Sequence, residues 1–294
     1  MIEGNELLPT VNGWLRAVDV RIGDILFDKD GLPCKVTEAT IETPPEVWKM
    51  VTTPGYTLRM THIPNNYKNN YKRYLTRAPT LEMPAREQLV DPYVFGLWFF
   101  DHTTVGKNKG LSIPVKREQL NKAVKALNNS GFGIFKRREV KIKKNAGVNV
   151  RFLTVPDLWA YLRPHYYKKP DLIPDEYLYA SLEQKHRLLD SFLDAHRRSH
   201  GMDHKCKLHK WVMFSNEKLT MQMAELIESL GYSIALRYHG KRNHVSFMWD
   251  PRPAKTIKSD AIKTMEPYKQ VPCVNIKTTS STYVATERRY VIFN

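Results

Sequence analysis

The chain has 294 residues, of which 42% are hydrophobic and 11% aromatic, a composition typical of a folded protein long enough for two domains. An excess of 46 Lys and Arg over 30 Asp and Glu gives a formal net charge of +16. This charge favours a polyanionic partner, usually nucleic acid; the alternative is a merely solubilising surface. No apolar run approaches the ~20 residues needed to cross a bilayer, and no basic leader follows Met1. With three cysteines in no metal-ligand spacing, we expect a soluble cytoplasmic protein with no membrane partner.

Short strand-like segments dominate residues 1–60. The stretches "TVNGW" and "DKDGLP" carry Asn-Gly and Asp-Gly turn signals between such segments. From about residue 92 to 260 the pattern changes to helices that alternate with basic strands, and strand character returns in "VPCVNIKTTSSTYVATERRYVIFN". We therefore expect an α+β chain in which one β domain, made from both chain ends, is interrupted by an inserted α/β domain.

The middle of the chain contains an internal repeat. "AVKALNNSGFGI" matches "MAELIESLGYSI" at an offset of one hundred residues, and in each a helix is expected to end at a glycine, Gly131 or Gly231. A basic stretch follows each glycine, "FKRREVKIKK" and "LRYHGKRNH". The inserted domain is therefore predicted to consist of two copies of one αββα-type unit related by a pseudo-twofold axis.

Two apolar helices precede these segments, and each ends on an ionisable residue. The stripe in "YVFGLWFFD" ends on Asp101, and the stripe in "RLLDSFLDAH" ends on His196. Small residues at equivalent places, Gly96 and Ser191, would let the two backbones approach closely. A carboxylate at the end of such a seam could hold a divalent cation. The plainer alternatives are a helix-end carboxylate satisfied by backbone or solvent and a hydrogen-bonded packing histidine.

These residues resemble a known family. "YVFGLWFFD" and "RLLDSFLDAH" resemble the two copies of the LAGLIDADG helix of homing endonucleases, and "LIPDEYLYASLEQKHRLLDSFLDAH" resembles the approach to the second copy in endonucleases carried inside inteins. The flanks "EGNELLPTVNGWLRAVDVRIGDILFDKDGLPCKV" and "CVNIKTTSSTYVATERRYVIFN" resemble the first and last blocks of the Hint, or protein-splicing, domain. The order of the blocks is more specific than any single match.

The resemblance implies an α+β architecture with three segments. A β-rich, horseshoe-shaped Hint-like domain would comprise residues 1–88 and 262–294. The inserted LAGLIDADG domain would comprise residues 89–261, with repeats at about 89–168 and 169–261. The chain would be a monomer with internal pseudo-twofold symmetry, and its partner would be double-stranded DNA.

The resemblance also implies a metal-dependent active site. In the family the last acid of each LAGLIDADG helix binds the catalytic metal, Mg²⁺ or Mn²⁺; Asp101 matches the first, whereas His196 stands where the second acid belongs. A histidine neutralises less of the metal's charge, which could leave a nickase, a slower enzyme or a DNA-binding relic. By repeat position, Lys144 and Lys241 are the basic residues expected to assist, although a solvated basic strand is the plainer interpretation of each lysine.

The basic stretches after the two glycines are the expected DNA-binding surface. Phosphate contacts would set the affinity and its salt dependence, and alternate strand residues would read the major groove. The candidate DNA-binding residues are Lys136, Arg137, Arg138, Lys141, Lys143, Arg237, Lys241 and Arg242.

The splicing residues depart from the Hint pattern. The family opens with Cys, Ser or Ala, whereas Met1 has a thioether that cannot perform an acyl shift. His62 matches the histidine of the second block, but Arg59 stands where Thr or Asp is usual.

At the other end, Asn294 matches the last residue of the pattern, whereas Phe293 replaces the penultimate histidine. Lys277 and Ser281 stand in place of an aspartate and a histidine of the last block. We therefore expect no splicing from this chain. The favoured function is a site-specific, Mg²⁺-dependent DNA endonuclease; the alternatives are a cleavage-impaired DNA-binding protein and a splicing element with a passenger endonuclease.

Overall fold

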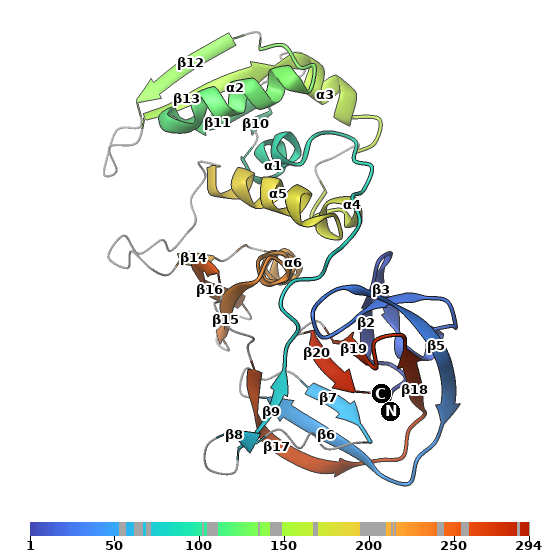
Figure 1. Ribbon diagram of the computed structural model, residues 1–294. Helices are drawn as coiled ribbons and strands as arrows, with labels where there is room; N and C mark the ends of the chain where they lie inside the picture. Colours follow the sequence, from blue (N-terminus) through green and yellow to red (C-terminus); the bar gives the residue numbers. More distant parts are fainter. Residues whose placement is uncertain are drawn as a thin grey trace. The chain divides into compact units, whose positions relative to one another are not determined.

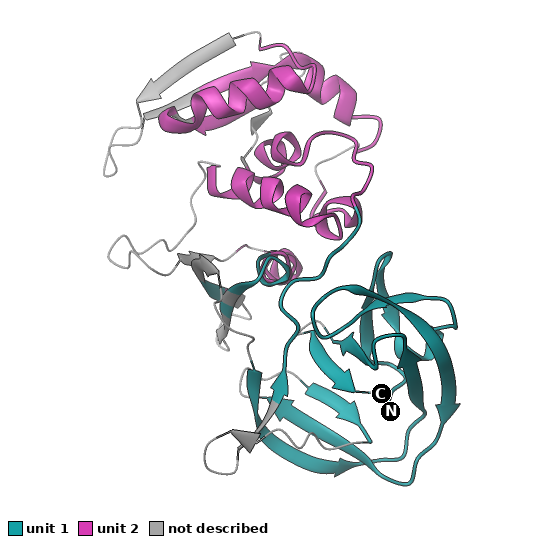
Figure 2. Cartoon of the chain, in the orientation of Figure 1, with its two compact units in different colours: residues 1–84, 227–237, 247–294 teal, residues 85–226, 238–246 magenta. Residues whose placement is uncertain are grey.

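The structure is a computed structural model divided into two compact units, coloured separately in Figure 2. Unit 1 comprises residues 1–84, 227–237 and 247–294, and unit 2 comprises residues 85–226 and 238–246. Unit 1 is mainly β structure, and unit 2 contains most of the helices (Figure 1). The described chain excludes residues 53–56, 62–66, 69–71, 102, 105–110, 135, 142–148, 167–169, 195–209, 213, 215, 240–243, 254–258, 287–288 and 294.

An antiparallel nine-stranded sheet forms most of unit 1, and its strands come from both ends of the chain. The strand order is β4–β5–β18–β1–β7–β6–β17–β9–β8. Ile2 of β1 lies opposite Val274 of β18 on one side and Met60 of β7 on the other, so the first strand is enclosed by later ones. The strands are β1 (Ile2–Glu3), β4 (Ile25–Phe27), β5 (Pro33–Glu42), β6 (Val47–Thr52), β7 (Thr57–Met60), β8 (Tyr67–Lys68), β9 (Lys72–Thr76), β17 (Ser259–Tyr268) and β18 (Cys273–Thr278).

Two hairpins complete the core of unit 1. One consists of β2 (Leu7–Thr10) and β3 (Gly13–Arg16), and the other of β19 (Thr282–Ala285) and β20 (Tyr290–Phe293); a short 3-10 helix, η1 (Ala17–Asp19), follows the first. Apolar side chains from both hairpins join those of the large sheet in one buried cluster. This burial supplies the main driving force for folding the unit.

Unit 2 is built around a pair of packed helices and a four-stranded antiparallel sheet, ordered β10–β11–β13–β12. The paired helices are α1 (Pro92–Asp101) and α5 (Leu182–Asp194). In Figure 1, α2 lies against one face of the sheet. The remaining elements are β10 (Thr103–Thr104), β11 (Leu111–Lys116), η2 (Arg117–Gln119), α2 (Leu120–Asn129), β12 (Lys136–Lys141), β13 (Asn149–Val155), α3 (Pro156–Leu162) and α4 (Asp175–Leu178).

The segment after α5 contains a similar, shorter series of described elements. It contains β14 (Lys210–Val212), α6 (Glu217–Ser229), β15 (Tyr232–His239) and β16 (His244–Pro253), with the sheet order β14–β16–β15. Gly131 and Gly231 follow α2 and α6 with φ angles of 81° and 84°, the left-handed conformation that ends a helix. The two glycine helix ends predicted from the repeat are therefore confirmed.

The order of elements in the first repeat, α1–β10–β11–α2, agrees with the predicted αββα and continues with β12, β13 and α3. In the second repeat the described elements are α5, β14, α6, β15 and β16, and residues 195–209 between α5 and β14 lie outside the described chain. The mixed α+β class and the large sheet agree with the sequence-based expectation. The boundary between the compact units passes through α6, at residues 226 and 227, and the domain boundaries at 88/89 and 261/262 stay predictions. Within the described parts of the chain, no helix has the length and hydropathy needed to cross a membrane.

Candidate functional site

Asp101 is the last residue of α1, a helix whose start is fixed by its sequence. The Asp91 carboxylate accepts hydrogen bonds from the backbone N–H of Tyr93 at 3.0 Å and of Val94 at 3.3 Å. Pro92, whose missing N–H costs nothing in the first turn, begins the helix. Ten residues therefore lead from a capped start to the candidate metal ligand.

From Tyr93 to Phe99, α1 is buried, and its residues there are suited to burial because they are all apolar or aromatic. Its side chains from Val94 to Phe99, apart from Gly96, are at most 1% exposed. Phe95 stacks on Tyr177 of α4 with ring centroids 3.9 Å apart, and Phe100 meets Phe192 of α5 edge to face at 5.0 Å. This packing fixes the position of α1 against α4 and α5.

α1 and α5 approach each other closely at Gly96 and Ser191. A Cβ atom added to Gly96 would lie 1.6 Å from the Ser191 Oγ and 2.7 Å from its Cβ, so no larger residue fits without movement. The Ser191 hydroxyl donates to the Leu188 carbonyl of its own helix at 2.6 Å and is fully buried. The close approach predicted from these two small residues is confirmed.

Four residues that the sequence analysis did not single out meet at the end of α5. Asp194 is 8% exposed, and its Oδ2 accepts hydrogen bonds from the Tyr93 hydroxyl and the Lys122 Nζ, both at 2.9 Å. Lys122 also bonds to the Oδ2 of Asp190 at 2.9 Å and lies 4.6 Å from the centroid of the Tyr93 ring. We call Tyr93, Lys122, Asp190 and Asp194 the α5-end cluster.

The electrostatics of the α5-end cluster favour a charged lysine and a neutral phenol. Burial alone would lower the pKa of Lys122, but its hydrogen bonds to Asp194 and Asp190 outweigh burial and raise that pKa. Burial, followed by the charge of Asp194, raises the pKa of Tyr93 far above its ordinary value. Lys122 therefore stays a cation and Tyr93 a hydrogen-bond donor at neutral pH.

β12 carries four of the candidate DNA-binding residues at the edge of the four-stranded sheet. Lys136 and Arg138 lie opposite Thr154 and Phe152 of β13, and Arg137 and Lys141 occupy the alternate positions. Arg237 lies in β15. The candidates outside the described residues are His62, Lys143, Lys144, His196, Lys241, Arg242 and Asn294. The assigned roles of all these residues stay predictions.

No preformed metal centre is found among the described residues. A group of three His, Cys, Asp or Glu side chains suited to holding a metal is absent from that part of the chain. The acids nearest the end of α5, Asp190 and Asp194, are both engaged by Lys122. The assignment of Asp101 as a metal ligand stays a prediction.

Arg59 of β7, which stands where Thr or Asp is usual in the Hint pattern, takes part in an ion network in unit 1. The Arg59 Nη1 lies 3.0 Å from the Glu3 Oε2 and 3.5 Å from the Glu6 Oε1, and both glutamates are at most 10% exposed. Met1 lies beside Thr61, whose backbone N–H donates to the Met1 carbonyl at 3.1 Å. The positive charge of Arg59 thus compensates the negative charges of Glu3 and Glu6.

The last strands likewise show what replaces the expected splicing side chains. Phe293 lies opposite Thr282 at the end of β20 and is 64% exposed, with no proton to transfer. Lys277 forms an exposed ion pair with Glu38 at 2.7 Å, and Ser281 has a φ of 60° in the turn before β19. The expectation that this chain does not splice stays a prediction.

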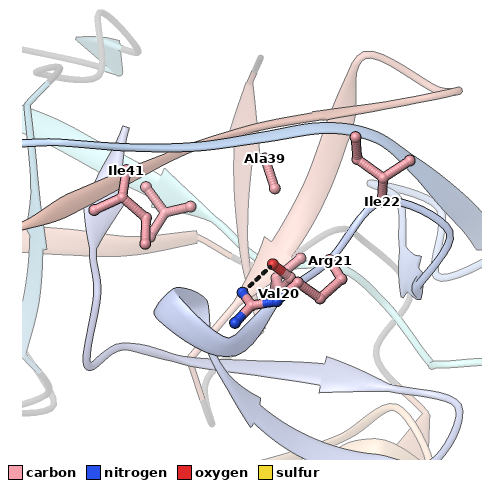
Figure 3. Close-up of a pocket in the computed structure, with 6 residues that line it drawn as sticks. Val20, Arg21, Ile22, Ala39 and Ile41 are labelled. Atoms are coloured by element: carbon pink, nitrogen blue, oxygen red, sulfur yellow. Dashed lines mark hydrogen bonds between the residues drawn. The ribbon is translucent and has the colours of Figure 1, made fainter.

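A shallow pocket of about 380 Å³ lies on the surface of unit 1 (Figure 3). Its lining residues are Val20, Arg21, Ile22, Ala39, Ile41 and Val274. The Arg21 guanidinium is its one charged group and donates to the carbonyl oxygens of Val18 and Val20, both at 3.0 Å. The pocket contains no acid, base or nucleophile that could carry out catalysis.

By sequence, the chain is similar to a curated helicase. The replicative DNA helicase DnaB of Mycobacterium intracellulare is 26% identical over an alignment of 272 residues, covering 76% of this chain. The chain spans 41% of the length of that helicase. No model of a protein family matches the chain.

Comparison with solved structures gives inteins and a nuclease. Two structures of the MchDnaB-1 intein match: one covers 100% of this chain and 98% of the intein at 9% identity with a TM-score of 0.32, and the other covers 26% and 53% at 23% identity with a TM-score of 0.21. The homing endonuclease I-WcaI, bound to its DNA recognition sequence, covers 56% of this chain and 77% of its own at 14% identity with a TM-score of 0.32.

The chain is similar to inteins and to a homing endonuclease. These are the two classes of protein that its helix motifs and flanking blocks resemble, and a DnaB relative is consistent with an intein context. At TM-scores of 0.21 to 0.32 the structural similarities carry no argument about the arrangement of the site. The site is therefore argued from the contacts within this chain.

Proposed function

We propose that this chain is an intein-type, site-specific DNA endonuclease. A Hint-like β domain from both chain ends would carry an inserted, pseudo-twofold LAGLIDADG domain that binds a long duplex target as a monomer. The observation that carries the proposal is the close approach of α1 and α5 at Gly96 and Ser191. Their sequences continue from that contact by the same five residues to Asp101 and His196.

The charge distribution supports binding to duplex DNA. The chain has a net charge of +16, four of the six residues of the edge strand β12 are Lys or Arg, and β15 contains Arg237. An edge strand in an antiparallel sheet is the kind of element that can follow a groove. Phosphate contacts would supply most of the affinity, so binding should weaken steeply as salt is raised.

Asp101 suits a divalent cation such as Mg²⁺ or Mn²⁺. Mg²⁺ is commonly held by one or two carboxylates together with substrate phosphate oxygens and water, so a single acid at a helix end is a compatible donor. When bound, the metal would neutralise phosphate charge, polarise the P–O bond and lower the pKa of a bound water. Lys144 and Lys241 would assist by stabilising negative charge that develops on the phosphate.

A second candidate function follows from His196. An imidazole is a poorer match than a carboxylate for Mg²⁺, so the α5 side of the site would bind metal less well. The chain would then nick one strand, or bind its target without cutting. The further alternative, a splicing element with a passenger endonuclease, is disfavoured by Phe293 and Arg59 in the places described above.

A plasmid assay tests these alternatives. Supercoiled plasmid carrying the uninterrupted coding sequence of a DnaB-type helicase is incubated with protein and Mg²⁺. A matched plasmid whose candidate site is split by an insertion is the control. We expect the first plasmid to be cut and the second to survive. Linear product supports a double-strand endonuclease, and open-circular product supports a nickase.

Two outcomes would contradict the endonuclease proposal. Salt-sensitive binding without cleavage, in Mg²⁺ and in Mn²⁺, would leave a DNA-binding protein. Equal cutting of both plasmids would show a nuclease without the proposed site specificity.

A further inference from the structure

The outer edge of β5 is only partly covered by its neighbour in the large sheet of unit 1. β4 pairs with Pro33–Lys35, and the N–H of Val36 donates to the carbonyl of Asp24, just before β4, at 2.8 Å. From Thr37 to Glu42, β18 pairs with β5 on one side, and no strand of the described chain pairs with it on the other. This stretch of extended backbone therefore offers N–H and C=O groups to a further strand.

The shallow pocket of unit 1 opens beside this edge. In Figure 3, Ala39 and Ile41 project from β5 on one side of the pocket, and Val20 and Arg21 lie on the other. Ile22 and Ile41 are 69% and 55% exposed, which places them among the most exposed large apolar side chains of the described chain. Exposed apolar surface beside an open strand edge is typical of a site for another chain.

The charged groups around the pocket indicate the chemistry of its occupant. The Arg21 guanidinium uses Nη1 for both of its bonds to carbonyl oxygens, which leaves Nε and Nη2 without a partner among the described residues. These two donors match the two oxygens of a carboxylate. The opposite face of β5 carries Glu38 and Glu42. Lys277 pairs with Glu38, whereas Glu42 is exposed and has no ion pair within the described chain, so a basic side chain suits that position.

We propose that the open edge of β5 and the pocket beside it bind an extended peptide segment of a partner protein by strand addition. The segment would pair its backbone with Thr37–Glu42 and place an aliphatic side chain against Ile22 and Ile41. On the same face an acidic side chain would reach Arg21, and on the other face a basic side chain would reach Glu42. The inference goes beyond the proposed nuclease function, because it concerns unit 1 alone.

A second copy of this chain is the alternative occupant, and the charges disfavour it. Antiparallel pairing of two β5 edges about Thr40 would place Glu38 of each copy opposite Glu42 of the other. Like charges directly opposite one another on neighbouring strands are destabilising. A partner segment of different sequence avoids this repulsion.

The test uses the full chain and a synthetic probe, a C-terminally amidated peptide in which isoleucine alternates with lysine before a single aspartate. Fluorescence anisotropy measures its affinity, and hydrogen exchange measures the protection of the β5 amides. We expect the peptide to slow exchange within residues 37–42. Two further peptides, each N-methylated along one edge, keep the side chains but lose the N–H donors of that edge. One of them should bind more weakly than the unmodified peptide by about tenfold or more.

Two pairs of variants test the side chains. Ile41→Thr keeps a β-branched residue but removes apolar surface; its control is Leu32→Thr, at a residue that is 49% exposed and outside the pocket. Arg21→Gln removes the guanidinium; its control is Arg16→Gln, at a residue that is also exposed and outside the pocket. We expect Ile41→Thr and Arg21→Gln each to weaken binding about tenfold, and both controls to bind like the wild type.

Any of three results would overturn the inference. They are unchanged exchange at residues 37–42 in excess peptide, equal binding of all three peptides, and binding at the wild-type affinity by both Ile41→Thr and Arg21→Gln. Self-association of the chain that Ile41→Thr abolishes would make a second copy the occupant, and would also overturn the proposal of a peptide partner.

Discussion

Helices in the two units are held against their neighbours in contrasting ways. In unit 2, α1 and α5 can approach closely because Gly96 has no side chain and faces the buried hydroxyl of Ser191. In unit 1, the end of α6 is held by a buried ion pair, in which the Arg77 Nη1 lies 2.9 Å from the Glu228 Oε1. Both side chains of this pair are at most 7% exposed.

The difference determines what each contact tolerates. A close helix crossing is sensitive to volume, because packed interiors leave no space for an added methyl group. A buried ion pair is sensitive to charge, because either partner left alone remains in a poorly solvating environment. A change of side-chain volume should therefore destabilise the helix crossing of unit 2 most. A change of charge should destabilise the buried ion pair of unit 1 most.

The largest effect is expected at the ion pair of unit 1. Arg77→Met should lower the free energy of unfolding by about 3–5 kcal/mol, since it removes one member of a buried ion pair. Asp260 would lose its contact with the Arg77 Nε at 3.9 Å as well. Urea unfolding measures the loss. Lys277→Met is the matched control because its ion pair is exposed, and it should cost less than ~1 kcal/mol. Similar losses of unfolding free energy in the two variants would show that burial of the ion pair makes no difference.

The next effect is expected at the helix crossing of unit 2. Gly96→Ala should lower the free energy of unfolding by about 2 kcal/mol, because the new methyl group would overlap Ser191. This loss should occur although alanine favours a helix by about 1 kcal/mol over glycine. A double variant with Ser191→Gly should recover part of the loss, since it removes both the Oγ and the Cβ of the clash. Additive losses in the double variant would show that the two residues do not meet.

A smaller effect is expected in alkaline solution. Burial raises the pKa of Tyr93, Tyr166 and Tyr177 in unit 2, with further increases from Asp194 or Glu176. A raised phenol pKa leaves stability unchanged below the unfolded value of about 10 and reduces it above that value. The helical circular dichroism signal, which comes mainly from unit 2, should show a loss of about 1 kcal/mol between pH ~9 and ~11. Tyr93→Phe should lose less stability over this pH range than the wild type. An equal loss would show that ionisation of Tyr93 does not contribute.

The sequence predicted those features that depend on local residue types. Gly96 and Ser191 have equivalent places in two apolar helices, and Gly131 and Gly231 end two matching helices, so both could be located without a structure. The α+β class followed from the change of periodicity along the chain. The αββα order expected for each unit is found in the first repeat, as α1–β10–β11–α2, whereas the additional strands β12 and β13 were not assigned to that unit.

Long-range charge pairing was not predictable from the sequence. Arg77 and Glu228 are 151 residues apart, and Lys122 and Asp194 are 72 apart, with no local pattern that selects either partner. A basic chain offers many alternative cations for each acid, so only the folded chain identifies the pairs. The α5-end cluster is therefore the part of the site that sequence analysis missed, although Asp194 lies within the quoted helix motif.

The account depends most directly on Asp101, at the end of α1. The decisive measurement is the rate of cleavage of the target plasmid by Asp101→Asn, with Asp157→Asn, an exposed acid of α3, as the control. We predict that Asp101→Asn binds the target like the wild type but cuts it roughly 100-fold more slowly or worse, a loss of about 2.7 kcal/mol in transition-state stabilisation. The control should cut at the wild-type rate. Cleavage by Asp101→Asn at the wild-type rate would contradict the central claim.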